Sequence, residues 1–139
     1  TFNLFNMTIS LEYNTDLKSN NKTIVIFVSS LSQLKNIDLV TNFDHYLKDK
    51  NFIKKISTQN QIILSNIMIN NALSDIIIHL IKPENQNLTI LGSSIFEYFL
   101  TTNSSNISFI FSPFMISKFK FLISDIIFGF LIRGYNFNK

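Results

Sequence analysis

The chain has 139 residues, of which 46% are hydrophobic and only 15% charged, so it can bury the core of about one domain and is too apolar to be intrinsically disordered. Its formal net charge of +3 is a weak bias towards anionic partners and decides no function by itself. The absence of cysteine excludes disulfides, thiolate metal sites and cysteine nucleophiles.

The first half of the chain predicts strand, helix, strand, strand. Residues 1–20 are ambiguous, because their apolar side chains fit both the alternation of a strand and one face of a helix. Residues 23–28 are a β-branched run typical of a buried strand. The apolar spacing of residues 31–47 then predicts an amphipathic helix of about five turns that packs Leu34, Val40, Phe43 and Leu47 on the sheet and ends at Asn51. Two strands, 52–57 and 61–69, follow, joined by a polar connection at 58–60.

The second half predicts a β-rich unit with two short helices. Strands are expected at 76–81, 88–91, 107–111 and 130–137. Helices are expected from Ser93-Ser94 to Leu100 and from Ser117, as N-cap, to Phe128, with Gly129 ending the second helix. The join between the halves is expected near residues 70–74.

Catalytic chemistry has little support in the sequence. His45 and His79 show no metal-ligand spacing, and the three glycines form neither a phosphate loop nor a nucleophile elbow. We therefore expect no enzymatic activity, no catalytic residue, no metal, no cofactor and no small-molecule substrate. We also expect no membrane span, because no segment reaches the roughly 18 consecutive apolar residues that a spanning helix needs.

Two polar segments are candidate nucleic-acid contacts. Lys48, Lys50, Lys54 and Lys55 form the densest basic cluster, which is either a solvated helix face or a surface that neutralises phosphates. Residues 112–120 combine serine hydroxyls and two lysines around a strand-to-helix turn, which suits phosphate and sugar contacts as well as it suits an ordinary capped helix.

The order of segments from about Thr23 to Phe137 resembles the bacterial-type small-subunit ribosomal protein S-eight family. That family has a Val-Thr-Val-Pro-Ser-Ser-Lys strand, for which residues 24–30 stand here, and a helix end Leu-Lys-Glu-Glu-Gly-Phe-Ile, which residues 47–53 resemble. Its Ile-Ala-Val-Val-Ser-Thr-Ser-Lys-Gly-Val-Met-Thr segment and its later Gly-Gly-Glu-Ile-Ile-Cys-Tyr-Val resemble residues 107–135 without a gap. Pro113, Phe114 and Met115 stand where that family has Ser, Lys and Gly, so the RNA-contacting loop is chemically altered.

The resemblance implies an α+β fold in two domains. Residues 1–72 would form an N-terminal α/β domain of helix, strand, long helix and two strands, and residues 73–139 a β-rich C-terminal domain, with two short helices, that binds small-subunit rRNA. The implied RNA-binding residues are Ser29, Ser30, Lys54, Lys55, Ser112, Pro113, Phe114, Ser117, Lys118 and Lys120.

The composition suggests where such a protein is made. Residue types with AT-rich codons (Ile, Asn, Phe, Lys, Tyr and Met) supply 74 of the 139 residues, as expected of an organellar gene. With the resemblance, this predicts a structural constituent of the mitochondrial small ribosomal subunit, located in the matrix and bound to rRNA and neighbouring ribosomal proteins. The alternative is a structural accessory subunit of an organellar respiratory complex. A small secreted protein or enzyme domain is a weaker alternative still.

Overall fold

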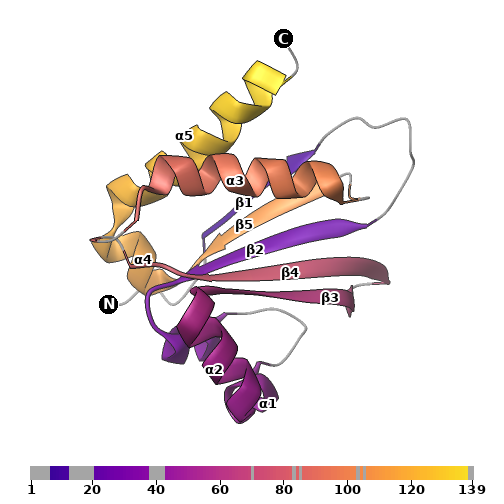
Figure 1. Cartoon of the computed structure of the whole chain (residues 1–139), viewed down its shortest axis with the longest axis vertical. Coiled ribbons are helices and arrows are strands. Elements are labelled where there is room, and N and C mark those ends of the chain that lie inside the picture. Colours follow the sequence, from indigo (N-terminus) through magenta and orange to yellow (C-terminus); the bar gives the residue numbers. More distant parts are fainter. Residues whose placement is uncertain are drawn as a thin grey trace.

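The computed structural model of the chain describes residues 7–12, 21–37, 43–69, 71–82, 84, 86–102, 104 and 106–137. These residues have mixed α and β content, with five strands in one sheet and helices on both of its faces (Figure 1). The strands are β1 (Met7–Glu12), β2 (Lys22–Val28), β3 (Gln61–Ile69), β4 (Ala72–Leu80) and β5 (Asn106–Phe111). Their order across the sheet is β1-β5-β2-β4-β3.

The strand directions follow from the connections. β2 lies between β4 and β5 and is parallel to both, which explains its uninterrupted apolar run, since a central parallel strand is buried on both faces. The outer strands β1 and β3 pair antiparallel with β5 and β4. β3 and β4 form a hairpin whose turn includes Asn71 at φ 65°. The left-handed conformation there suits asparagine, which tolerates it better than most residues.

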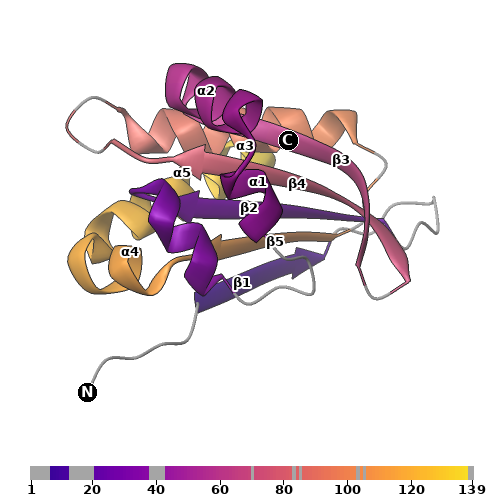
Figure 2. The ribbon, with the colours of Figure 1, turned by 90° about the horizontal axis from the view of Figure 1, so that it is seen from below.

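The helices form the two outer layers of a sandwich. A 3-10 helix, η1 (Leu31–Asn36), lies with α1 (Asp44–Leu47) and α2 (Lys50–Gln59) on one face of the sheet (Figure 2). The other face carries α3 (Leu88–Thr101), α4 (Pro113–Lys118) and α5 (Lys120–Phe137). Each layer buries its own apolar cluster against the sheet. Leu34, Phe43, Phe52 and Ile56 fill one cluster, whereas phenylalanines from β2, β5, α3 and α5 dominate the other.

All three glycines of the chain lie where α3 meets α5. A Cβ at Gly92 would lie 1.9 Å from the Ile126 carbonyl oxygen, and a Cβ at Gly129 would lie 2.0 Å from the Thr89 carbonyl oxygen. The backbones of α3 and α5 are therefore in direct contact, and only glycine, which has no Cβ, permits so close an approach. Gly134 is less constrained, because a Cβ there would meet the ring of Phe96 at 2.9 Å.

The helix predicted over residues 31–47 is wrong as a continuous element. The described residues in this range form η1 and the single turn of α1, and Val40 lies outside the described residues. The predicted core role of Leu34 and Phe43 is confirmed, whereas Leu47 is only half-buried. Asn51 lies in the first turn of α2, whereas the sequence predicts it at the carboxyl end of a helix.

The strand predicted at 52–57 is also wrong, because these residues belong to α2. Phe52 and Ile56, four residues apart, are its buried positions, which is a helical spacing. Asn60, at φ 59°, ends the helix in the left-handed conformation expected for Asn51. The strands predicted at 23–28, 61–69, 76–81 and 107–111 are confirmed in substance by β2, β3, β4 and β5.

Two strands predicted in the second half are helical instead. Residues 88–91 form the first turn of α3, which Asn87 caps by accepting a hydrogen bond from the Ile90 amide at 3.1 Å. Residues 130–137 continue α5, and Gly129 lies within that helix instead of ending it. At the N-terminus, residues 7–12 form a strand, so the helix implied there by the resemblance is wrong for these residues. Strands from 1–72 and 73–139 alternate across one sheet, so a boundary at residue 72 would divide that sheet.

Candidate RNA-binding surface

Three of the predicted site residues lie together at one end of the sheet, where β2 and β5 reach their carboxyl ends. Ser29 and Ser30 follow β2, Ser112 follows β5, and the two strands are parallel neighbours. The chain leaves β2 towards η1 on one face of the sheet and leaves β5 towards α4 on the other. Such a divergence opens the sheet at the carboxyl ends of its strands, where ligands of open α/β sheets commonly bind.

Gln33 joins the two strand ends beneath this surface. Its Nε2 donates to Ser29 Oγ at 2.6 Å, and its Oε1 accepts from the Ser29 amide at 3.0 Å and from the Ser112 hydroxyl at 2.7 Å. Ser112 is 0% exposed and also caps α4, because its Oγ accepts from the Met115 amide at 3.3 Å. The expectation that the Ser112 hydroxyl contacts RNA therefore does not fit this structure. Ser30 is exposed and lies 3.1 Å from Ser32, hydroxyl to hydroxyl.

The exposed surface at this end of the sheet is aromatic and basic. We call it the α4 corner, and it is formed by Pro113, Phe114, Ser117, Lys118, Phe119 and Lys120. Phe114 is 42% exposed, and the Lys118 ammonium lies 5.3 Å from its ring centroid and 6.0 Å from that of Phe119. The two rings meet edge to face at 6.0 Å. Lys118 is therefore held over two aromatic rings while its charge remains accessible to an anion.

The sequence predicts Ser117 as the N-cap of a helix, and this prediction is wrong. Ser117 lies inside α4, and its hydroxyl donates to the Phe114 carbonyl oxygen at 3.1 Å. The helix starts earlier, at Ser112, with Pro113 in its first turn, where a missing N–H costs nothing. Ser117 and Lys120 are exposed, and Pro113 is half-buried. These residues, unlike Ser112, are available to a partner.

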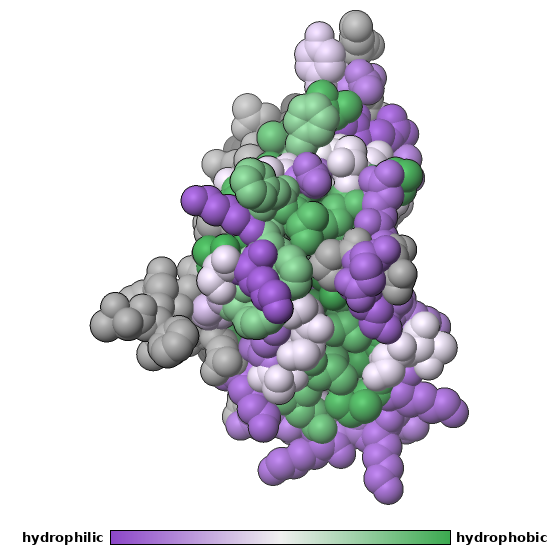
Figure 3. Space-filling model, turned by 90° about the vertical axis from the view of Figure 1, so that its left-hand side faces the viewer, coloured by the Kyte–Doolittle hydropathy of each residue, from purple (hydrophilic) through white to green (hydrophobic). Residues whose placement is uncertain are grey.

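Lys54 and Lys55 lie elsewhere, on the exposed side of α2 and therefore over the opposite face of the sheet. Lys48 and Lys50 are exposed as well, so the basic cluster predicted from the sequence is a second surface and not part of the α4 corner. Figure 3 views the side of the molecule that lies at the left of Figure 1. It shows hydrophilic side chains projecting at the lower end and an apolar strip above them. The predicted site residues therefore divide between two surfaces.

The polar groups that sequence reasoning missed are the half-buried Gln33 and Tyr98 and the exposed Gln61. Gln33 acts through Ser112, which is 79 residues away in the chain, so no local pattern marks it. Gln61 and Tyr98 line a small pocket with His79, whose burial lowers its pKa from 6.5 to about 4. Among the described residues, no group of three or more histidine and acidic side chains is arranged to hold a metal ion.

The described helices include none that is long and apolar enough to cross a bilayer. The fold places the chain in the broad class of three-layer α/β/α sandwiches with a mixed sheet. Comparison with models of protein families, with curated proteins and with solved structures finds no match. The function must therefore be argued from the surfaces of the molecule itself.

Proposed function

We propose that the chain is a structural constituent of the mitochondrial small ribosomal subunit, where it binds rRNA through the α4 corner and neighbouring proteins through its apolar surface. The observation that carries this proposal is the exposed pairing of Phe114 with Lys118. An aromatic face beside an ammonium group matches a base beside its phosphate. Lys120 begins the next helix and adds a second exposed charge.

The chemistry of the α4 corner favours recognition of the RNA backbone and of unpaired bases. Lys118 and Lys120 neutralise phosphates, and the Phe114 ring provides a stacking surface. Side chains cannot read base edges in the deep major groove of an A-form duplex, so shape, 2′-hydroxyls and unstacked bases are the features within reach. The exposed α2 lysines, including Lys54 and Lys55, offer a second phosphate contact.

The apolar surface supports permanent residence in an assembly. Phe121, Phe128, Leu131, Ile132 and Tyr135 of α5 are all exposed, Phe121 by 86%. Apolar side chains gathered in this way on one helix are typical of a protein interface. This feature alone also favours the alternative of an accessory subunit in a respiratory complex. That alternative, however, gives no role to Lys118 over Phe114.

Membership of the S-eight family is a separate proposal with less support. Residues 52–57 and 130–137, which the sequence pattern predicts as strands, lie in α2 and α5. The ribosomal role rests on the composition and on the α4 corner, and it does not require that membership.

A salt titration of RNA binding tests the role of the α4 corner. The full chain, fused to a soluble carrier, is titrated with a fragment of small-subunit rRNA at several salt concentrations. K118A/K120A should weaken binding and reduce the slope of log affinity against log salt by about one to two. K22A is the matched control, since Lys22 is an exposed lysine at the opposite end of β2. K54A/K55A measures the α2 surface.

Equal affinities and slopes for K118A/K120A, K22A and the unmodified chain would remove the α4 corner as an RNA-binding surface. A loss confined to K54A/K55A would transfer that role to α2.

A further inference from the structure

A row of rings crosses the sheet on the face that carries α3. Phe111, Phe27 and His79 are direct cross-strand neighbours on β5, β2 and β4. The Phe27 ring stacks on Phe111 at 4.7 Å and on His79 at 5.6 Å, with interplanar angles of 10° and 14°. The next position in the row is Gln61 of β3, which pairs with His79. The aromatic row thus ends at a primary amide.

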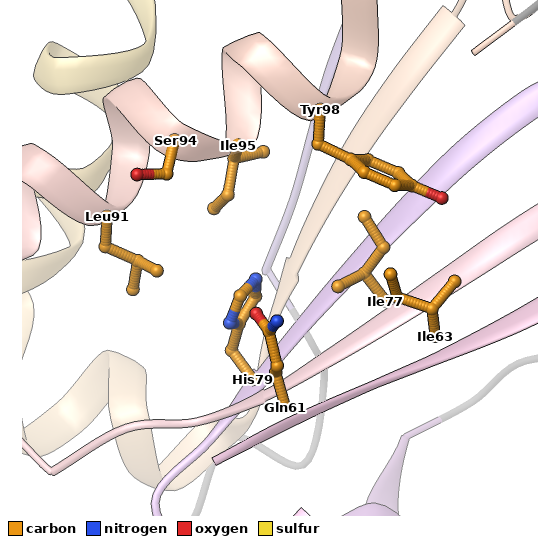
Figure 4. Close-up of a pocket in the computed structure, with 8 residues that line it drawn as sticks. All are labelled: Gln61, Ile63, Ile77, His79, Leu91, Ser94, Ile95 and Tyr98. Atoms are coloured by element: carbon orange, nitrogen blue, oxygen red, sulfur yellow. The ribbon is translucent and has the colours of Figure 1, made fainter. Parts of the chain in front are cut away.

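A pocket of about 170 Å³ opens where this row ends, between α3 and the β3–β4 pair (Figure 4). Its apolar walls are Ile63, Ile77, Leu91 and Ile95, and its polar groups belong to Gln61, His79, Ser94 and Tyr98. α3 covers β4, but Gln61 and Ile63 of β3 remain exposed. The pocket is therefore connected to solvent along the β3 side.

His79 is the central polar group of this pocket. It is 6% exposed, and its imidazole contacts Phe27 on one side and borders the pocket on the other. Burial lowers its pKa to about 4, so at neutral pH the ring is uncharged, with one nitrogen that donates and one that accepts. Within the described part of the chain, neither nitrogen makes a hydrogen bond, and neither is among the fully buried polar atoms that lack a partner, so both nitrogens retain access to the pocket.

The surroundings of the pocket select against anionic ligands. Among the described residues that line it there is no lysine or arginine. Burial and, to a lesser extent, the negative charge of Asp75, which is half-buried on β4, raise the pKa of the Tyr98 phenol. A phosphate or carboxylate would meet this negative charge without a compensating cation. The volume is also below the roughly 300 Å³ of pockets for drug-sized ligands, which limits the occupant to about one ring.

We propose that this pocket binds an uncharged, planar heterocycle the size of a single base, hydrogen-bonded through a donor and an acceptor to His79 and Gln61. The pocket between α3 and the β3–β4 pair, at about 170 Å³, has room for about one ring, and the neutral imidazole and the amide each offer a donor and an acceptor. This inference goes beyond the proposed function and does not depend on the α4 corner. The heterocycle is supplied either as a free molecule or as an unpaired base of RNA.

Uracil is the probe that tests the proposal, with benzene as a ring of similar size that lacks hydrogen-bonding groups. Binding to the full chain, fused to a soluble carrier, is measured by ligand-observed NMR at pH 7.5, with the carrier alone as the blank. H79F keeps the stacked row but removes both ring nitrogens, and Q61A removes the amide from an exposed position. S57A, on the exposed side of α2, is the matched control.

Uracil should bind the unmodified chain and S57A equally and should bind H79F and Q61A at least tenfold more weakly. Benzene should bind all four alike. The proposal would be overturned if uracil did not bind the unmodified chain, or if H79F and Q61A bound uracil as tightly as the unmodified chain does. K118A/K120A should leave the affinity for uracil unchanged, so failure here and failure of the ribosomal proposal are separate results.

An oligouridylate distinguishes the two sources of the heterocycle. If it displaces uracil from the unmodified chain, and Q61A weakens that displacement, the pocket accepts an RNA-borne base. If uracil binds but the oligomer does not displace it, the pocket is restricted to a free heterocycle, and the assignment of ligand chemistry still holds.

Discussion

His79 shows how one residue links burial to the pH dependence of stability. Its pKa is about 4 in the folded chain, against an ordinary value of 6.5, because burial penalises the charged ring. As the pH falls below 6.5, the unfolded chain takes up this proton and the folded chain does not. The stability contributed by neutral His79 is therefore present above pH 6.5 and is lost as the pH falls towards 4.

This linkage predicts a measurable difference between the unmodified chain and H79F. Urea unfolding at pH 7 and at pH 4 should show that the unmodified chain loses roughly 3 kcal/mol more of its unfolding free energy than H79F does. The loss measured for H79F is subtracted from the loss measured for the unmodified chain. This difference excludes the titration of the carboxylates, because both chains contain them. Identical pH dependence in the two chains would mean that His79 is accessible to protons in the folded state.

The residues of the α4 corner illustrate what sequence reasoning can and cannot find. Lys118 and Phe114 were predicted as site residues and are exposed and in contact. Ser112 was predicted as a contact, but Gln33 holds it in the interior. The burial of Ser112 depends on Gln33, which is 79 residues away in the chain. A hydroxyl-rich turn has the same sequence pattern whether it faces solvent or a buried amide.

Among the elements, the buried strands were predictable, and the helices predicted at 93–100 and 117–128 lie within α3 and, apart from Phe119, within α4 and α5, whereas α2 and the helix boundaries were not predicted. Residues 23–28 of β2, 76–78 of β4 and 109–111 of β5 are continuous β-branched or aromatic runs, a pattern typical of strands buried on both faces. α5 is apolar on nearly every side, so it shows no helical period, and Gly129 imitates a helix end. The reason for Gly129 is tertiary, because α3 touches α5 at that residue.

The contact between α3 and α5 predicts unequal effects of two glycine substitutions. G129A places a methyl group against the Thr89 backbone, so it should destabilise the chain by about 1–3 kcal/mol or more, despite the better helix propensity of alanine. G134A meets only the edge of the Phe96 ring, which can shift, so its cost should be smaller. Thermal unfolding of both variants measures the difference. Equal melting temperatures would contradict the close approach of the two helices.

At the scale of the whole molecule, the sandwich buries two separate clusters and still leaves apolar side chains on α5 exposed. The chain carries few charges for its surface, so we expect it to be poorly soluble outside its assembly.

Substitutions on the exposed side of α5 test this expectation. F121S/F128S should increase the soluble yield of the isolated chain and leave the urea midpoint nearly unchanged, because neither side chain is in the core. F130S is the contrasting variant, since Phe130 is fully buried and its loss should unfold the chain. If the unmodified chain purifies as a soluble monomer at all salt concentrations, α5 needs no protein partner.

The most direct test of the ribosomal role is ultraviolet cross-linking in intact organelles, with mass spectrometry of the nucleotide-linked peptides of this chain. We predict that the chain sediments with the small ribosomal subunit and carries nucleotide adducts within residues 113–120, with Phe114 as the preferred site, and that K118A/K120A loses these adducts. Sedimentation with a respiratory complex, with no nucleotide on any peptide of the chain, would contradict the account and favour the accessory-subunit alternative.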